Sequence, residues 1–142
     1  MKDAVQRIVQ CFETLTPAGV AGLGHVYRDD ARFADPFNQV QGLAAIQQVY
    51  EHMYATLDAP RFVITHQLVD GSQCFLVWDF SFCFRNFKRG QRQTVRGASH
   101  LVLAADGRIQ LHQDYWDAAH GLYEKLPVVG GLMRWLKKRA GG

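Results

Sequence analysis

Three ionisable side chains in the sequence could together carry out proton transfer, namely Asp35, His100 and Asp114. Asp35 lies between two phenylalanines in the segment "ARFADPF". Apolar neighbours would remove water from its carboxylate, which raises the pKa of an acid towards the range of a useful general base. His100 could donate a hydrogen bond to a developing enolate, and Asp114 could orient that histidine or hold a water molecule. We therefore predict these three as the catalytic residues.

Each of these residues also has a purely structural interpretation. Asp35 precedes Pro36, and an aspartate in that position often bonds the backbone of the turn that follows it. His100 and Asp114 could belong to a polar cluster in which Arg96 pairs with Asp114 across two strands. Both interpretations remain open for each residue.

A metal ion would require His100, His112, Asp114 and Asp35 to meet within bonding distance of one point. Their spacing in the sequence matches no metal-binding motif. We therefore expect neither a metal nor another cofactor.

The elements that must position these residues follow from the periodicity of the apolar side chains. Apolar residues recur at helical spacing over 5–15 and 43–57, and Thr16-Pro17 indicates the start of a second, short helix. A brief strand covers 31–37. Alternating patterns then predict strands at 61–70, 74–87, 92–104 and 107–116.

This order, α-α-β-α-β-β-β-β followed by a helical tail over 119–139, predicts an α+β fold in one domain spanning residues 1–142. The four late strands, joined by short turns, predict a curved antiparallel sheet packed on the N-terminal helices.

The alternation within each strand predicts which side chains share a face. Trp78, Phe80 and Phe82 lie on one face of the strand over 74–87. A three-residue turn over 105–107 would set His100 opposite His112 and place Ala98 opposite Asp114. One face would then gather the aromatic side chains beside Arg96, His100, His112 and Asp114.

Two arrangements of the sheet are compatible with this pattern. The aromatic and polar face could be wet near its edge, with the Leu and Ile side chains forming the core. Alternatively, it could line a cavity while the other face packs against a second subunit through Val77, Leu101, Leu103, Ile109 and Leu111. A sheet that is apolar on both faces must be covered on both, and one layer of helices covers only one face. This favours a homodimer through the outer face.

Three segments, in this order, resemble the nuclear transport factor 2-like superfamily. They are "YRDDARFADPF", "GLAAIQQVY" and "ADGRIQLHQDYWD". The superfamily includes ketosteroid isomerases, SnoaL-type polyketide cyclases and limonene epoxide hydrolases. The resemblance implies a cone-shaped sheet that encloses an apolar pocket. It aligns Asp35 with the isomerase's catalytic base, Tyr50 with a pocket tyrosine, and Asp114 with a carboxylate that helps the hydrolase to activate water.

Other positions depart from both enzymes. Cys11 and Phe12 stand where the isomerase carries its oxyanion-hole tyrosine, and Trp78 and Phe80 stand where the hydrolase carries an Arg and an Asp. The sequence therefore supports two hypotheses. The first is a cofactor-independent isomerase, cyclase or hydratase/hydrolase that acts on an apolar small molecule in a closed pocket, with Asp35 as general base. The second is a non-catalytic binding or scaffold protein that retains the pocket. The side chains predicted to bind the ligand are Phe33, Phe37, Tyr50, Tyr54, Trp78, Phe80, Phe82, Arg96, His112 and Trp116.

The composition indicates the cellular compartment and the classes of partner. The chain has 142 residues, and its three cysteines show no metal-type spacing, which is typical of reduced thiols in a cytoplasmic protein. A net charge of +3, concentrated in "RWLKKRAGG", does not indicate nucleic acid binding. The apolar and basic tail could touch an anionic membrane surface or dock over the mouth of the pocket.

Overall fold

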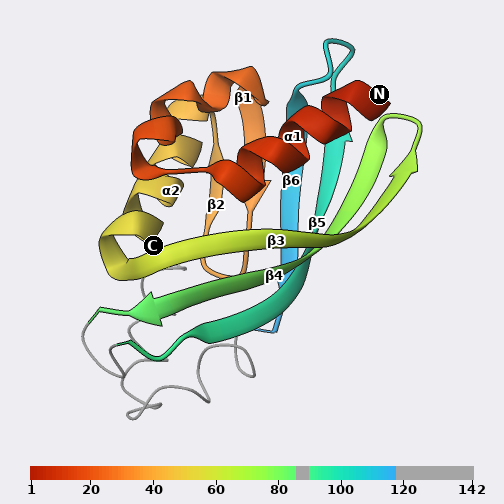
Figure 1. The fold of residues 1–142 in the computed structure, drawn as a ribbon. Helices are drawn as coiled ribbons and strands as arrows, with labels where there is room; N and C mark the ends of the chain where they lie inside the picture. The colour runs from red at the N-terminus through yellow and green to blue at the C-terminus, as the bar shows by residue number, and fades with distance from the viewer. Residues whose placement is uncertain (86–89, 118–142) are drawn as a thin grey trace.

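The computed structural model describes residues 1–85 and 90–117. Figure 1 shows helices packed on one side of a strongly curved sheet, in which β3 and β4 run across the direction of β1 and β6. The α+β class is confirmed. The helical elements are α1 (Lys2–Thr14), η1 (Pro17–His25) and α2 (Leu43–Thr56), and the strands are β1 (Tyr27–Ala34), β2 (Gln39–Gln41), β3 (Leu57–Asp70), β4 (Gln73–Phe84), β5 (Gln93–Leu103) and β6 (Ile109–Trp116).

The predicted antiparallel sheet of the four late strands is confirmed, and β1 and β2 extend it into a mixed sheet. Its strand order is β2-β1-β6-β5-β4-β3, and β1 runs parallel to β6 while the other neighbours are antiparallel. The long connection between β1 and β6, which contains α2 and four strands, makes the parallel pairing possible. It also brings Phe33 of β1 directly opposite His112 of β6.

The helices follow their sequence patterns. Val5, Ile8 and Phe12 of α1 are buried against the sheet. The second predicted helix forms as a 3-10 helix, and the side chain of Thr16 accepts a hydrogen bond from the backbone N–H of Gly19 at 3.1 Å. The glycines in that segment disfavour a regular α-helix, which agrees with the short or loosely held helix predicted there.

The register between β4 and β5 decides which side chains face the helices. Trp78 lies opposite Gly97. The side chains of β5 that face the helices therefore include Ser99 and Leu101, and those of the residues next to them in sequence face away. A Cβ atom at position 97 would overlap the indole ring of Trp78, which explains why glycine occupies this position in mid-strand. Arg96 and His100 therefore lie on the opposite face from Trp78, and the prediction that they share its face is wrong.

The hairpin between β5 and β6 combines the predicted turn with an unpredicted bulge. The backbone N–H of Ala104 donates to the carbonyl of Arg108 at 2.8 Å, and Gly107 has a φ of +82°, as a three-residue turn requires. Beyond the pair Leu103–Ile109, however, the register shifts by one residue, so that Gln110 has no partner on β5.

The bulge changes every pair beyond it. His112 lies opposite Leu101, and Asp114 lies opposite Ser99. The predicted pairs, His100 with His112 and Ala98 with Asp114, are therefore wrong. One slip in register moves a whole set of side chains relative to its neighbours, and sequence alternation alone does not reveal it.

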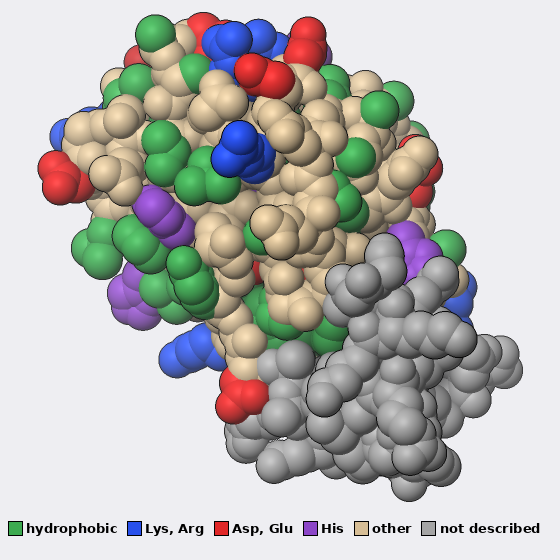
Figure 2. Space-filling view, turned by 180° about the vertical axis from the view of Figure 1, so that it is seen from behind, with side chains coloured by type: hydrophobic (Ala, Val, Ile, Leu, Met, Phe, Trp, Pro, Cys, Tyr) green, Lys and Arg blue, Asp and Glu red, His purple; other side chains and the backbone are tan. Residues whose placement is uncertain are grey.

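The outer face of the sheet also differs from the prediction. Leu101, Leu103 and Ile109, which were expected to meet a second subunit, are buried in the core. The outer face instead exposes apolar side chains such as Phe75 and Tyr115. A homodimer through this face stays a prediction. In the view of Figure 2, basic and acidic side chains of the described residues are interspersed.

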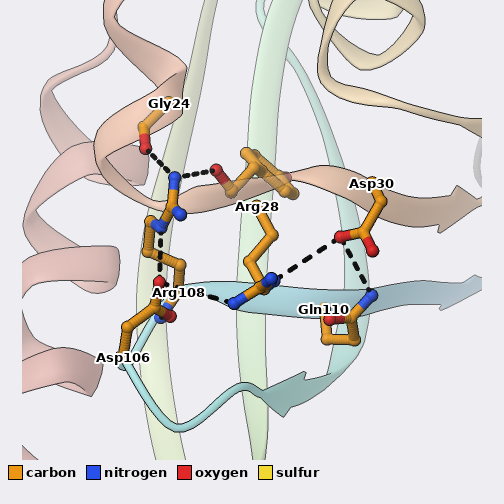
Figure 3. Close-up of polar contacts among 7 residues, drawn as sticks. Gly24, Arg28, Asp30, Asp106, Arg108 and Gln110 are labelled. Atoms are coloured by element: carbon orange, nitrogen blue, oxygen red, sulfur yellow. Dashed lines mark hydrogen bonds and ion pairs between the residues drawn. The ribbon is translucent and has the colours of Figure 1, made fainter.

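A cluster of polar contacts fastens the β5–β6 turn to the start of β1 (Figure 3). The guanidinium of Arg108 donates to the carboxylate of Asp106 at 2.9 Å and to the carbonyl of Gly24 at 3.2 Å. Arg28 lies between the carboxylates of Asp106 and Asp30, at 3.6 and 3.5 Å. These contacts hold together the two strands that supply most of the polar groups described below.

Replacing Arg108 by alanine should lower the free energy of unfolding by about 1–2 kcal/mol, because the half-buried guanidinium bonds both a carboxylate and a main-chain carbonyl. Urea unfolding measures the change. The matched control is Arg32→Ala, since Arg32 is an exposed residue of β1. Equal losses in the two variants would contradict the role given to Arg108.

Candidate functional site

A cavity of about 460 Å³ lies between α2 and the inner face of the sheet. Aromatic and aliphatic side chains make up most of its wall, and its size is typical of small-molecule sites. Most of the residues predicted for the site line it: Phe33, Asp35, Phe37, Tyr50, Trp78, Phe80, Phe82, His112, Asp114 and Trp116.

The carboxylate of Asp35 is fixed by the turn that follows it. Its Oδ1 accepts hydrogen bonds from the backbone N–H groups of Phe37 and Asn38, at 2.8 and 2.6 Å. The side-chain amide of Asn38 donates to Oδ1 at 3.1 Å and to Oδ2 at 3.2 Å. Asp35 thus makes the turn bonds of the structural interpretation and lines the cavity as well. The two interpretations are compatible.

Burial raises the pKa of the Asp35 carboxyl above its ordinary value. The hydrogen bonds from Phe37 and Asn38 act in the opposite direction, and the nearby charge of Asp114 raises the pKa further. The net shift is upward, so that burial outweighs the turn bonds.

Asp114 ends a chain of buried hydrogen bonds. Its Oδ1 lies 2.6 Å from Nε2 of His112 and accepts a hydrogen bond from the hydroxyl of Ser99 at 2.5 Å. The other ring nitrogen of His112, Nδ1, lies 2.6 Å from the hydroxyl of Tyr27, which in turn lies 2.8 Å from the hydroxyl of Tyr50. The chain connects α2, β1, β5 and β6.

One arrangement of protons satisfies every bond of this chain with a neutral imidazole. An ionised carboxylate only accepts, so Nε2 of His112 donates to Asp114. Nδ1 then accepts from Tyr27, and Tyr27 accepts from Tyr50. Burial raises the pKa of both tyrosines far above the ordinary value, so each hydroxyl keeps its proton to donate. The donors all point in one direction, towards Asp114.

Three residues that hydrogen-bond the polar groups of the site were not predicted from the sequence. Tyr27 lies at the start of β1, before the strand that the sequence indicated. Ser99 was placed on the opposite face, and it also accepts a hydrogen bond from the indole N–H of Trp78 at 2.9 Å. Asn38 follows the Asp-Pro pair and bonds Asp35. Asn38 carried a recognisable local signal, since the polar residues after an Asp-Pro pair often complete its turn.

Three predicted residues lie away from the cavity wall. His100 stacks on Phe75 on the outer face, with ring centroids 4.6 Å apart. Arg96 pairs with Asp79 on the same face, at 3.1 Å, and not with Asp114. Tyr54 does not line the cavity either, although it packs against the core.

The set considered for a metal ion is therefore not brought together, because His100 is on the wrong face. Within residues 1–85 and 90–117, no three His, Cys, Asp or Glu side chains are placed to hold an ion. No helix in the same ranges is long and apolar enough to cross a membrane. The apolar and basic tail, predicted over 119–139, lies outside the described residues.

A family model described as the SnoaL-like domain matches residues 5–112, which include both Asp35 and His112. The chain belongs to the SnoaL-like family. This SnoaL-like domain shows no significant sequence match to curated proteins.

Solved structures share the fold at low sequence identity. A candidate SnoaL-like polyketide cyclase from Shewanella putrefaciens is 20% identical, with a TM-score of 0.72 over 88% of this chain and 96% of its own. An epoxide hydrolase from M. tuberculosis, similar to the limonene enzymes, is 15% identical, with a TM-score of 0.67 over 99% and 95%. A hypothetical protein with a ketosteroid isomerase-like fold from Catenulispora acidiphila, in complex with trimethylamine, is 16% identical, with a TM-score of 0.71 over 84% of this chain and 88% of its own.

Replacing Tyr27 by phenylalanine should lower the free energy of unfolding by about 1–3 kcal/mol, because Nδ1 of His112 and the hydroxyl of Tyr50 both lose a buried partner. Urea unfolding measures the loss. Tyr115→Phe removes the same hydroxyl from the exposed outer face and should change stability by less than about 0.5 kcal/mol. Similar values for the two variants would show that the hydrogen-bond chain contributes little.

Proposed function

We propose that this protein is a cofactor-independent enzyme that acts on an apolar small molecule in the cavity, with Asp35 as general base. The observation that carries the proposal is that two carboxylates, Asp35 and Asp114, line the same largely apolar cavity. Membership of the SnoaL-like family supports a small-molecule-binding or catalytic role in general.

The surroundings of Asp35 suit the removal of a carbon-bound proton. A carboxylate with a raised pKa is a stronger base, and it can return the proton to another atom of the same substrate. The turn bonds fix its position, so that little reorganisation is needed during the reaction. Proton removal and return of this kind would serve an isomerase or a cyclase.

Asp114 could serve as the second polar group of the site. Its Oδ1 is occupied by His112 and Ser99, while no described residue donates to Oδ2, which could hold a water molecule or a hydroxyl group of the substrate. A water held there would allow the hydratase or hydrolase variant of the proposal. His100 cannot donate a hydrogen bond to a substrate in this cavity, because its side chain lies on the outer face.

A binding protein without catalysis is the second candidate. The specific observation in its favour is that Oδ1 of Asp35 already accepts three hydrogen bonds, which weakens a base. The Catenulispora protein, which shares the fold, holds trimethylamine, so this fold can take up a small molecule.

The test uses nitrobenzisoxazole, whose ring opens when a base removes its single reactive C–H proton and the N–O bond breaks, releasing a coloured cyanophenolate. Asp35→Asn should lower kcat/KM at least about a hundredfold, because the amide keeps the acceptor for the turn but cannot take the proton. The wild-type rate should fall as the pH is lowered through the pKa of Asp35, which is raised above 3.8.

The control is Asp79→Asn, which makes the same chemical change on the outer face and should leave the rate unchanged. A wild-type rate no higher than that of Asp35→Asn would contradict the enzyme and favour the binding protein. A loss of rate in Asp79→Asn as large as in Asp35→Asn would show that the effect does not arise in the cavity.

A further inference from the structure

We propose that the cavity takes a ligand with an apolar body and a protonated amine, whose ammonium group lies between the carboxylates of Asp35 and Asp114. The proposal rests on the proposed function in one respect, namely that the cavity is a ligand site. It adds the charge and the chemical class of the ligand.

The fixed charges on the described part of the cavity wall are negative. Among the described residues that line it, Asp35 and Asp114 are acidic, and none is lysine or arginine. His112 is committed to Tyr27 and Asp114. An anionic ligand would therefore meet two carboxylates and, among the described lining residues, no lysine or arginine to offset them, whereas a cation would be attracted by both.

The hydrogen-bonding capacity of the two carboxylates points to a ligand that donates. No residue in the described ranges donates to Oδ2 of Asp114, and its Oδ1 is fully engaged. Oδ2 of Asp35 accepts one long bond, at 3.2 Å, from Asn38. Oδ2 of Asp114 is not fully buried, because among the described residues no buried side-chain polar atom lacks a partner. An ammonium group carries N–H donors for both oxygens, and such charge-assisted bonds are stronger than neutral ones.

The rest of the wall matches an organic cation rather than a small inorganic one. Trp78 and the stacked pair Phe62–Phe80 present aromatic rings to the cavity, and Phe37 and Trp116 form an edge-to-face pair with centroids 5.3 Å apart. Aromatic faces attract organic ammonium groups and bury the apolar carbons attached to them. The volume of about 460 Å³ leaves room for a ring beside the amine.

The two carboxylates also repel each other when no ligand is bound. The charge of Asp114 raises the pKa of Asp35, so that an ionised Asp114 disfavours the ionised form of Asp35. A ligand cation placed between them would cancel this repulsion. Neither a hydroxyl group nor a carboxylate can do so.

Three soluble probes with the same phenyl body and different end groups test the proposal. They are phenethylamine, phenethyl alcohol and hydrocinnamate, which carry an ammonium, a hydroxyl and a carboxylate at neutral pH. Binding is followed by NMR chemical-shift titration of the wild-type protein. We expect the amine to bind at least about tenfold more tightly than the alcohol, and hydrocinnamate to bind most weakly.

Variants then assign the preference to the two carboxylates. Asp35→Asn and Asp114→Asn should each remove most of the amine's advantage over the alcohol. Asparagine keeps an oxygen that can accept the bonds now made to Oδ1 of either side chain, and circular dichroism checks that each variant is folded. Asp79→Asn, on the outer face, should keep the full preference.

The outcomes separate this proposal from the proposed function. If the alcohol binds as tightly as the amine, or hydrocinnamate binds best, the cationic ligand is excluded while the cavity remains a ligand site. If Asp79→Asn loses the preference as Asp35→Asn does, general surface charge explains it and the proposal fails. If no probe binds, the amine ligand is excluded, while the nitrobenzisoxazole test still decides the proposed function on its own.

Discussion

The imidazole of His112 is held on both sides by buried hydrogen bonds, and the polar end of the cavity depends on it. One nitrogen contacts Tyr27 and the other contacts Asp114. A buried ring nitrogen without a partner costs about 1–3 kcal/mol, so the two contacts determine where the ring can lie. Phe33 packs edge-on against the same ring, with centroids 4.7 Å apart. Hydrogen bonding and packing thus fix the carboxylate of Asp114 towards the cavity.

This arrangement requires the mixed sheet and the bulge in β6. The parallel pairing of β1 with β6 places Tyr27 and Phe33 beside the strand that carries His112. The unpaired Gln110 shifts the register, so that Ser99 rather than Ala98 lies opposite Asp114 and can bond it. Without the shift, the carboxylate of Asp114 would lie opposite the methyl group of Ala98. The irregularity in the strand therefore contributes directly to the chemistry of the site.

The sequence predicted the elements better than their relative placement. Helical spacing correctly indicated the buried face of α1, and the turn after Ala104 had the predicted form. The faces of neighbouring strands were matched wrongly, because alternation within one strand does not say which face of the next strand lies beside it. Gly97 was the missed signal. A glycine in mid-strand indicates a close approach, and here the ring of Trp78 covers it. Asp35 was found because its signal is local, whereas Tyr27 depends on a contact between distant segments.

The central claim is that Asp35 and Asp114 are two carboxylates in one desolvated cavity, close enough to influence each other. NMR titration of the carboxyl carbon of Asp35 tests it most directly, in the wild type and in Asp114→Asn. The account predicts a wild-type midpoint above the ordinary value of 3.8, because of burial and the neighbouring charge, and a lower midpoint in the variant. A midpoint at or below 3.8, or one that does not move when Asp114 loses its charge, would contradict the account.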